Sequence, residues 1–293
     1  MHADVIEGFL PQPLASSTDA VRDIARLAIR SLHTELRLHP KPGLVTPLDN
    51  GSHRDMTADT FMRSLFSLRH YFVQITQAGT ESASFETLRE LGIAAEHTMM
   101  RATGGVNTHR GAIFAVGMLS AAIGACSASE LKQPLRADNI RHILMQRWGP
   151  ALQRHAFRMP TEKHPAPLQD GARTEAALGF PSVFEIGLPT LRQSLTRRHN
   201  WHHACIDTLF ALIAQIDDTN MVHRGGRAGA DEARAMAQHF IDAGGTGNPA
   251  WERAAKTIGQ HYVTLNLSPG GAADLLAATC LVYWASFVDR PPQ

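Results

Sequence analysis

The spacing of apolar residues is the feature of this sequence that most restricts its fold. Apolar side chains recur every three or four positions, and stretches that alternate apolar and polar residues are nearly absent. In residues 18–38, for example, Ile24, Ala28, Leu32 and Leu36 follow this spacing. Such a spacing places side chains on one face of an α-helix, whereas a half-buried strand needs alternation. The sequence therefore predicts an all-α fold.

The same pattern predicts about ten helices within one compact domain that spans residues 1–293. Besides residues 18–38, the expected helices cover residues 57–77, 85–101, 109–125, 138–158, 182–198, 201–216, 228–243, 250–265 and 271–287. A hydrophobic content of 44% supplies enough apolar surface for a sizeable core. We expect residues 1–16 to be flexible and residues 159–173 to form a mobile surface loop.

Charge and cysteine content exclude several classes of protein. With 28 Lys and Arg against 27 Asp and Glu, the net charge of +1 creates no overall field that would draw the chain to nucleic acid or an anionic membrane. The N-terminus lacks the basic region of a secretory signal, and the apolar stretch 272–288 is too short and polar for a membrane span. Cys126, Cys205 and Cys280 stand far apart, which fits a reducing compartment. We expect a cytoplasmic protein.

Polar residues gather in the loops between the expected helices, and the first of these loops covers residues 41–56. Lys41 and His53 supply donors there, while Asp49 and Asp55 supply the hard oxygen ligands that divalent cations prefer. An ordinary connector, in which Asp55 caps the next helix, is the alternative.

A second loop, residues 102–111, opens an apolar helix. Its residues with suitable groups are Gly104, Gly105, Asn107, Thr108, His109 and Arg110. Exposed amides at a helix start, flanked by hydroxyls and an arginine, favour phosphate binding. The loop lacks the patterns of dinucleotide and Walker-type sites. Alternatively, the two glycines end one helix and Thr108 caps the next.

A third loop, residues 217–226, repeats the Asn, His, Arg and Gly theme of the second loop. The repeated residues are Asn220, His223, Arg224 and Gly225, and they suggest two anionic groups or one long polyanion. We place Asp217 and Asp218 at the end of the preceding helix, where the helix dipole disfavours carboxylates. This unfavourable placement suggests a divalent cation.

Three further groups complete the candidates. Ser268, Gly270 and Gly271 precede the last helix and place Asp274 in its first turns, where the dipole tolerates a carboxylate without any ligand. Glu175 is expected on a short helix within residues 171–181. No Glu completes a zinc motif around His199, His202 and His203, so we expect ordinary surface histidines there.

Five stretches taken in order resemble one family. They are KPGLV at 41–45, GSHRDM at 51–56, GGVNTHRGAIF at 104–114, DDTNMVHRGG at 217–226 and SPGGAADLLAAT at 268–279. Together they resemble the triphosphoribosyl-dephospho-CoA synthases, which make the prosthetic-group precursor of citrate lyase and malonate decarboxylase. Thr46 follows Val45 as in the malonate decarboxylase branch, whereas the citrate branch tends to place Asp there. A carboxylate needed at this point must come from Asp49.

The resemblance implies that the ribose 2′-hydroxyl of 3′-dephospho-CoA displaces adenine from C1′ of ATP, with Mg²⁺ bound to the triphosphate. The phosphate-binding candidates are then Lys41, His53, Gly104, Gly105, Asn107, Thr108, His109, Arg110, Asn220, His223, Arg224, Gly225, Ser268, Gly270 and Gly271. The metal candidates are Asp49, Asp55, Glu175, Asp217 and Asp218, and the catalytic candidates are Glu96, Asp55 and Asp274. We choose Glu96 as the base because it lies among apolar residues in mid-helix. Pairing of Glu96 with Arg89 or Arg101 is the alternative.

The expected partners are ATP, 3′-dephospho-CoA and the enzyme that transfers the product to the acyl carrier protein of malonate decarboxylase. The sequence leaves open whether the chain forms a homodimer. Two other functions fit the same loops. One is an all-helical, Mg²⁺-dependent nucleotide hydrolase or glycohydrolase with water as the acceptor, and the other is a non-catalytic carrier of a nucleotide or CoA.

Overall fold

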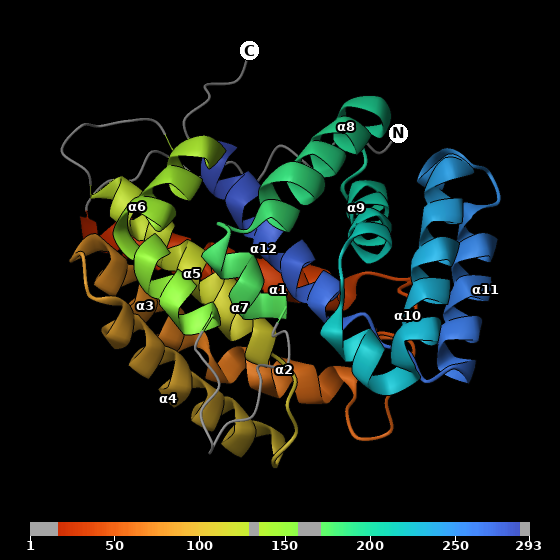
Figure 1. Ribbon diagram of the computed structural model, residues 1–293, viewed down its shortest axis with the longest axis horizontal. Coiled ribbons are helices and arrows are strands. Elements are labelled where there is room, and N and C mark those ends of the chain that lie inside the picture. Colours follow the sequence, from red (N-terminus) through yellow and green to blue (C-terminus); the bar gives the residue numbers. More distant parts are fainter. Residues whose placement is uncertain (1–16, 129–134, 158–170, 288–293) are drawn as a thin grey trace, which may run out of the picture.

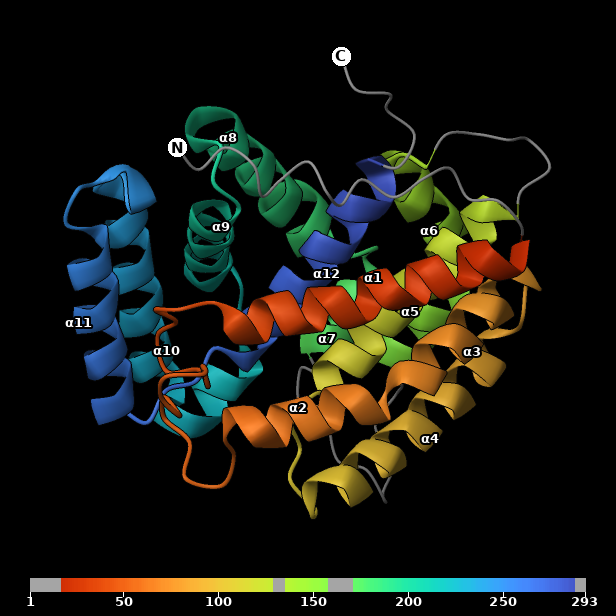
Figure 2. The ribbon, with the colours of Figure 1, turned by 180° about the vertical axis from the view of Figure 1, so that it is seen from behind.

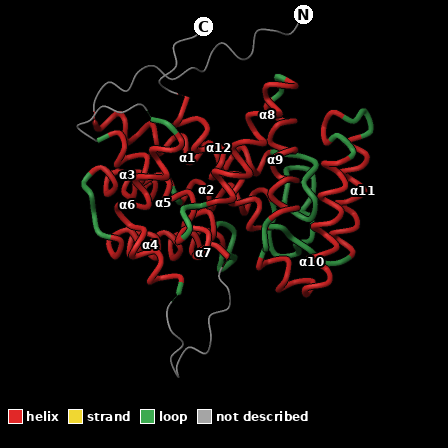
Figure 3. The backbone as a smooth tube through the Cα atoms, turned by 45° about the horizontal axis from the view of Figure 1, so that its top comes forward, coloured by secondary structure: helices red, strands yellow, loops and turns green. Residues whose placement is uncertain are grey.

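The computed structural model describes residues 17–128, 135–157 and 171–287. These residues form helices and connecting loops without any strand, which confirms the all-α prediction (Figure 3). The prediction for residues 1–16 lies outside the described residues. So does that for residues 159–173, except for its last three residues, which begin a short helix.

Twelve α-helices lie within the described residues. Figure 1 shows how they are arranged. They are α1 (Ser17–Arg37), α2 (Ala58–Ser67), α3 (Arg69–Thr80), α4 (Phe85–Thr103), α5 (Arg110–Ser127), α6 (Ala137–Ala156), α7 (Gly171–Ala177), α8 (Leu188–Arg198), α9 (Trp201–Gln215), α10 (Thr219–Asp242), α11 (Trp251–Thr264) and α12 (Gly270–Phe287). A π-helix, η1 (Ser182–Gly187), leads into α8, and a 3₁₀ turn, η2 (Gly245–Gly247), follows α10.

The centre of the fold consists of the two most apolar helices, α5 and α12. Helix α12 packs on α1, α5 and α9, and α5 packs on α3, so other helices surround both. Helix α5 is long and apolar enough to cross a membrane, but 78% of it is buried within the structure. Burial on all sides explains why these two helices lack a polar face.

Two expected boundaries differ from the structure. The helix expected over residues 57–77 is broken at Leu68, whose amide bonds back to the carbonyl of Leu65, so that α2 and α3 are separate. Helix α10 starts at Thr219 rather than near residue 228, because Asp218 caps it and because Gly226 adopts φ 70°, ψ 178° and lets the helix resume after a kink. Most of the predicted third loop is therefore helical.

The loops rich in polar residues meet near the start of α10. The chain between α1 and α2 runs along α10 before it enters α2 (Figure 2). Arg224 on α10 donates to the carbonyl of Ser52 in this loop. The start of α12 lies against Asp218, and Asp274 on α12 lies against Gly111 at the start of α5. Three helix starts thus converge on one region.

Candidate active site

Asp218 joins the starts of α10 and α12. Its Oδ1 accepts hydrogen bonds from the amides of Asn220 at 2.8 Å and Met221 at 3.4 Å, and its Oδ2 accepts one from the amide of Ala272 at 3.1 Å. Burial raises the pKa of Asp218, and these amides partly oppose the rise. Because Asp218 precedes α10 instead of ending α9, the inference from an unfavourable helix dipole is wrong.

Asp274, on α12, lies against the start of α5. It accepts a hydrogen bond from the amide of Ala112, and a Cβ atom at position 111 would overlap its carboxylate, so this position needs glycine. Burial raises the pKa of Asp274 well above its ordinary value, and the negative charges of Glu35 and Asp218 raise it further. The side chain remains half-buried rather than enclosed. It is therefore an accessible carboxylate of raised basicity.

Lys41 and Glu35 form a buried ion pair. The Nζ of Lys41 lies 2.5 Å from Oε1 of Glu35 and donates at 2.8 Å to the Glu35 carbonyl, with the side chains 1% and 8% exposed. Burial lowers the pKa of Lys41, while Glu35 opposes this change. The predicted phosphate ligand Lys41 thus anchors the first loop to α1. Glu35 lies outside the five motifs, and its one signal in the sequence is a charged residue three positions after Leu32 on the apolar stripe.

Asp49 and Asp55 are the exposed carboxylates of the first loop. The Oγ1 of Thr46 accepts the amide of Asp49 at 3.1 Å, and Oδ1 of Asp49 accepts the amide of Gly51 at 2.9 Å. Asp55 lies 3.8 Å from Nδ1 of His53. Asp55 does not cap α2, because Thr57 does. Both carboxylates remain open to a ligand.

Arg224 and His53 link the first loop to the connection between α11 and α12. Arg224 donates at 2.8 Å to both the carbonyl oxygen and Oδ1 of Asn266, and it also donates to Ser52. Nε2 of His53 lies 2.8 Å from Oγ of Ser268. Burial and the charge of Arg224 lower the pKa of His53. These two predicted phosphate ligands serve as cross-links in the free protein.

In the second loop, the alternative in which the two glycines end a helix is confirmed. Gly104 (φ 69°) ends α4, and Gly105 continues the turn in a left-handed conformation (φ 93°). Asn107 accepts the amide of Arg110 at 3.2 Å. Asp274 accepts the amide of Ala112. The side chains of Asn107 and Asp274 thus bind amides at the start of α5 that were expected to bind phosphate.

Thr108 does not cap α5, which begins after His109. The hydroxyl of Thr108 instead donates to Oγ of Ser64 at 2.7 Å, and Ser64 contacts Nδ1 of His109 at 2.6 Å. Burial, together with the nearby charge of Lys41, lowers the pKa of His109 to about 3. His109 is therefore neutral at physiological pH. Ser64 carries no motif that sequence reasoning could have recognised.

Glu96 lies on the face of α4 that meets the start of α5. Its Oε2 is 3.1 Å from Nε of Arg110, and the two side chains are 33% and 56% exposed. Arg89 pairs with Glu86, and Arg101 donates to Thr98, so neither expected partner holds Glu96. Glu96 therefore lies in a half-exposed ion pair with Arg110, and not in the apolar surroundings that suggested its role as a base.

The other metal candidates have partners within the protein. Glu175 on α7 accepts the amide of Ser182 at 3.2 Å and its hydroxyl at 2.6 Å, and burial raises the pKa of Glu175. Asp217 is paired with Arg227 at 2.7 Å. Among the described residues, no three His, Cys, Asp or Glu side chains gather as a metal site, and this includes the histidines near residue 200.

The remaining phosphate candidates lie beside these groups. His223 is exposed on the first turns of α10, and Gly225 packs against Leu267. Asn220 lies against Gly270, and Gly271 lies against Asp218. The structure therefore gathers these parts of the third loop and of residues 266–271 around the joined starts of α10 and α12.

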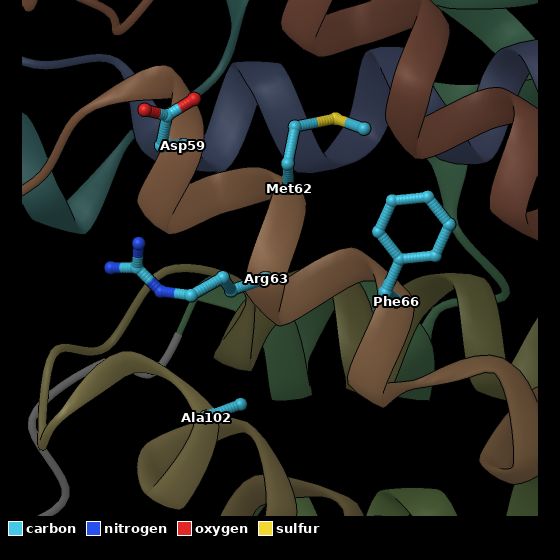
Figure 4. Close-up of a pocket in the computed structure, with 5 residues that line it drawn as sticks. All are labelled: Asp59, Met62, Arg63, Phe66 and Ala102. Atoms are coloured by element: carbon cyan, nitrogen blue, oxygen red, sulfur yellow. The ribbon is translucent and has the colours of Figure 1, made fainter.

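A hollow of about 590 Å³ lies between α2 and the end of α4 (Figure 4). Its lining residues are Asp59, Met62, Arg63, Phe66 and Ala102. The lining is mainly apolar, with one cationic side chain, Arg63, and one anionic side chain, Asp59.

Comparison with known proteins shows the family of this chain. Residues 21–289 match the model of the CitG family, described as ATP:dephospho-CoA triphosphoribosyl transferase. Relatives named "Probable 2-(5''-triphosphoribosyl)-3'-dephosphocoenzyme-A synthase" include one from Acinetobacter calcoaceticus, 37% identical over 86% of this chain and 87% of the relative. Another, from Vibrio cholerae serotype O1 (strain M66-2), is 35% identical over 94% of this chain and 93% of the relative.

No solved structure matches this fold significantly. The family match, however, spans almost the whole described structure, including all five of the motif stretches. The relatives match over nearly their full lengths at well above 30% identity. The chain belongs to the ATP:dephospho-CoA triphosphoribosyl transferase family, and it is an enzyme.

Proposed function

We propose that this enzyme transfers the triphosphoribosyl group of ATP to the 2′-hydroxyl of 3′-dephospho-CoA and releases adenine. The carrying observation is the family match over residues 21–289. The convergence of the polar loops at the starts of α5, α10 and α12, with carboxylates beside cationic side chains, supports it. In this reaction the C1′–N bond of ATP breaks and a C1′–O bond forms, while the hydroxyl proton passes to a base.

Asp274 suits the base better than Glu96 does. A ribose hydroxyl is a weak nucleophile at neutral pH, so a carboxylate of raised pKa is an effective acceptor for its proton. Burial and neighbouring charge raise the pKa of Asp274, whereas Arg110 neutralises Glu96. We assign to Glu96 the task of holding Arg110 near the start of α5.

The accessible cations near these carboxylates are suited to the triphosphate. Arg110 is exposed and directly follows His109, and His223 is exposed on α10. Lys41 is enclosed with Glu35, so it acts by positioning the first loop. Charge-assisted hydrogen bonds to phosphate are stronger than neutral ones, which favours Arg110 as the main contact.

The residues present fit Mg²⁺ bound jointly with ATP. Mg²⁺ in nucleotide sites usually takes one or two carboxylates and completes its shell with phosphate oxygens and water, so no full protein cage is required. The negative charges of Glu35 and Asp218 act on Asp274, but Lys41 pairs with Glu35, and these three carboxylates do not gather as a metal site. Exposed Asp49 and Asp55 could contribute from the first loop. When bound, Mg²⁺ would neutralise the triphosphate.

We also propose that the product serves malonate decarboxylase, in the cytoplasm. Thr46 supports this assignment because it holds the turn that contains Asp49, as the resemblance requires when Asp does not follow Val45. The hollow beside Arg63 is a candidate site for part of the dephospho-CoA chain, since its lining is mainly apolar and carries one cationic and one anionic side chain, Arg63 and Asp59.

Adenine release separates this function from its alternatives. The enzyme is incubated with ATP and Mg²⁺, with and without 3′-dephospho-CoA, and the nucleotides are separated by chromatography. We expect adenine only when 3′-dephospho-CoA is present. Adenine, ADP or phosphate formed without the acceptor would indicate a hydrolase, and binding without any product would indicate a carrier.

A further inference from the structure

His109 carries a buried nitrogen that the described structure leaves without a partner. The residue is 3% exposed, and within the described residues Nε2 makes no hydrogen bond. Its other nitrogen, Nδ1, lies 2.6 Å from Oγ of Ser64, which is fully buried. Buried polar atoms in proteins are nearly always satisfied, so an orphaned ring nitrogen beside other polar groups indicates a missing acceptor or donor.

The hydrogen bonds around Ser64 determine which ring nitrogen carries the proton. Thr108 donates its hydroxyl hydrogen to Oγ of Ser64 at 2.7 Å. The hydrogen of Ser64 remains available for Nδ1 of His109, which is 2.6 Å away, and we assign it there. Nδ1 is then an acceptor, and a neutral imidazole must carry its proton on Nε2. The orphaned atom is therefore a hydrogen-bond donor in need of an acceptor.

The surroundings of this donor favour an anionic oxygen. His109 directly precedes α5, an 18-residue helix whose start carries partial positive charge. The ammonium of Lys41 lies near enough to affect the ring, and exposed Arg110 follows it. Phe61 packs edge-on against the ring with centroids 5.0 Å apart and helps to fix its plane.

We propose that His109 donates its Nε2–H to a phosphate oxygen of a bound nucleotide substrate, with Ser64 and Thr108 as positioning residues that fix its tautomer. The identity of the nucleotide, ATP or 3′-dephospho-CoA, rests on the proposed function. Nε2 is enclosed in the free protein, so binding requires a local opening. The exposed turn at Gly104 and Gly105, a few residues before His109, borders open space.

Two substitutions of His109 separate the roles of its two nitrogens. In His109→Gln the amide N–H reaches the place of Nε2, whereas in His109→Asn the shorter amide reaches only the place of Nδ1. Binding of ATP and of 3′-dephospho-CoA is measured separately by calorimetry. We expect His109→Gln to stay within about threefold of the wild-type affinity for both nucleotides, and His109→Asn to lose about tenfold or more for one of them. Equal losses, no loss, or a greater loss in His109→Gln would overturn the proposal.

The tautomer itself gives a readout that does not depend on how the variants fold. Two-bond proton–nitrogen correlation spectra of the wild-type protein labelled at histidine distinguish the two neutral forms, and His109→Gln identifies the signals. We expect the Nε2–H form in the wild type, a mixture of forms in Ser64→Ala, and no change in the control Ser67→Ala, whose hydroxyl bonds to the carbonyl of Ser64. An Nδ1–H form in the wild type would refute the proposal.

Binding and product formation are measured separately, so failure of this inference differs from failure of the proposed function. If the two variants show the predicted binding pattern but the wild-type enzyme makes no triphosphoribosyl product, the role of His109 is supported and the proposed reaction is refuted. If the wild-type enzyme makes the product but His109→Asn binds both nucleotides normally, the proposed reaction is supported and the role of His109 is refuted.

Discussion

At the scale of single residues, the proposed reaction depends most on Asp274. It is half-buried, it caps a helix start, and burial and the charges of Glu35 and Asp218 raise its pKa. Asp274→Asn keeps the shape and the contact with the Ala112 amide but removes the basic oxygen. We expect kcat to fall by about 10² to 10⁴ while the affinity for ATP changes only a few-fold.

Glu96→Gln is the matched control for this kinetic test. Because Glu96 is a half-exposed partner of Arg110, its loss should weaken ATP binding by a few-fold and change kcat little. A large fall of kcat in Glu96→Gln, with near-normal kcat in Asp274→Asn, would return the role of base to Glu96.

The raised pKa of Asp274 also predicts how stability depends on pH. The folded protein holds this proton more tightly than the unfolded chain does, so ionisation costs stability as the pH rises above the ordinary Asp value of about 3.9. Asp274→Asn should therefore unfold at a higher temperature than the wild type at pH 8. The difference should shrink toward pH 4. Thermal unfolding in the presence of a chelator checks this, and a less stable variant at pH 8 would contradict it.

Substitution of Lys41 tests whether this motif residue binds the ligand or stabilises the folded protein. Lys41→Ala would leave the carboxylate of Glu35 buried without its partner, which typically costs about 3 to 5 kcal/mol. We expect a marked loss in the free energy of unfolding, measured with urea, and substantial recovery in the double variant Glu35→Gln/Lys41→Met. A Lys41→Ala protein of normal stability that fails to bind ATP would show direct contact with phosphate instead.

At the scale of helices, the joined starts of α10 and α12 depend on one carboxylate and not on its neighbour. Asp218 accepts amides from both helices, whereas Asp217 forms an exposed pair with Arg227. Asp218→Ala should lower the free energy of unfolding by about 1 to 3 kcal/mol, and Asp217→Ala by less than about 1 kcal/mol. Denaturant unfolding compares the two, and equal effects would refute the capping role.

The apolar spacing predicted the ends of most helices within a few residues, because a helix that buries one face needs apolar residues every three or four positions. It failed where a local hydrogen bond decided the structure. Leu68 breaks the helix expected over residues 57–77 without interrupting its apolar stripe, and Asp218 starts α10 early by capping it. Neither event changes the spacing of apolar residues, so periodicity alone could not show it.

The candidate site was predictable as a set of loops but not as a set of roles. The motifs around Asp218, Arg224 and Asp274 do meet in space. Their tasks depend on partners from other segments, such as Asn266 for Arg224 and Glu35 for Lys41, which no local motif reveals. Residues that looked like phosphate ligands are therefore partly internal anchors.

At the scale of the whole molecule, a bundle of helices presents its loops at one region, where α5, α10 and α12 begin. Helix starts stabilise negative charge, and here they hold Asp218 and Asp274. The result is a site that combines fixed carboxylates with exposed cations. This combination suits a reaction in which a hydroxyl loses a proton beside a bound polyphosphate.

Transfer of ATP labelled with carbon-13 throughout its ribose tests the central claim most directly. The wild-type enzyme is incubated with this ATP, Mg²⁺ and 3′-dephospho-CoA, and the products are identified by mass spectrometry. We predict that the labelled ribose and all three phosphates appear together on 3′-dephospho-CoA, with unlabelled adenine released in equal amount. Label that remains attached to adenine in ADP or AMP, or transfer of phosphate without ribose, would contradict the account.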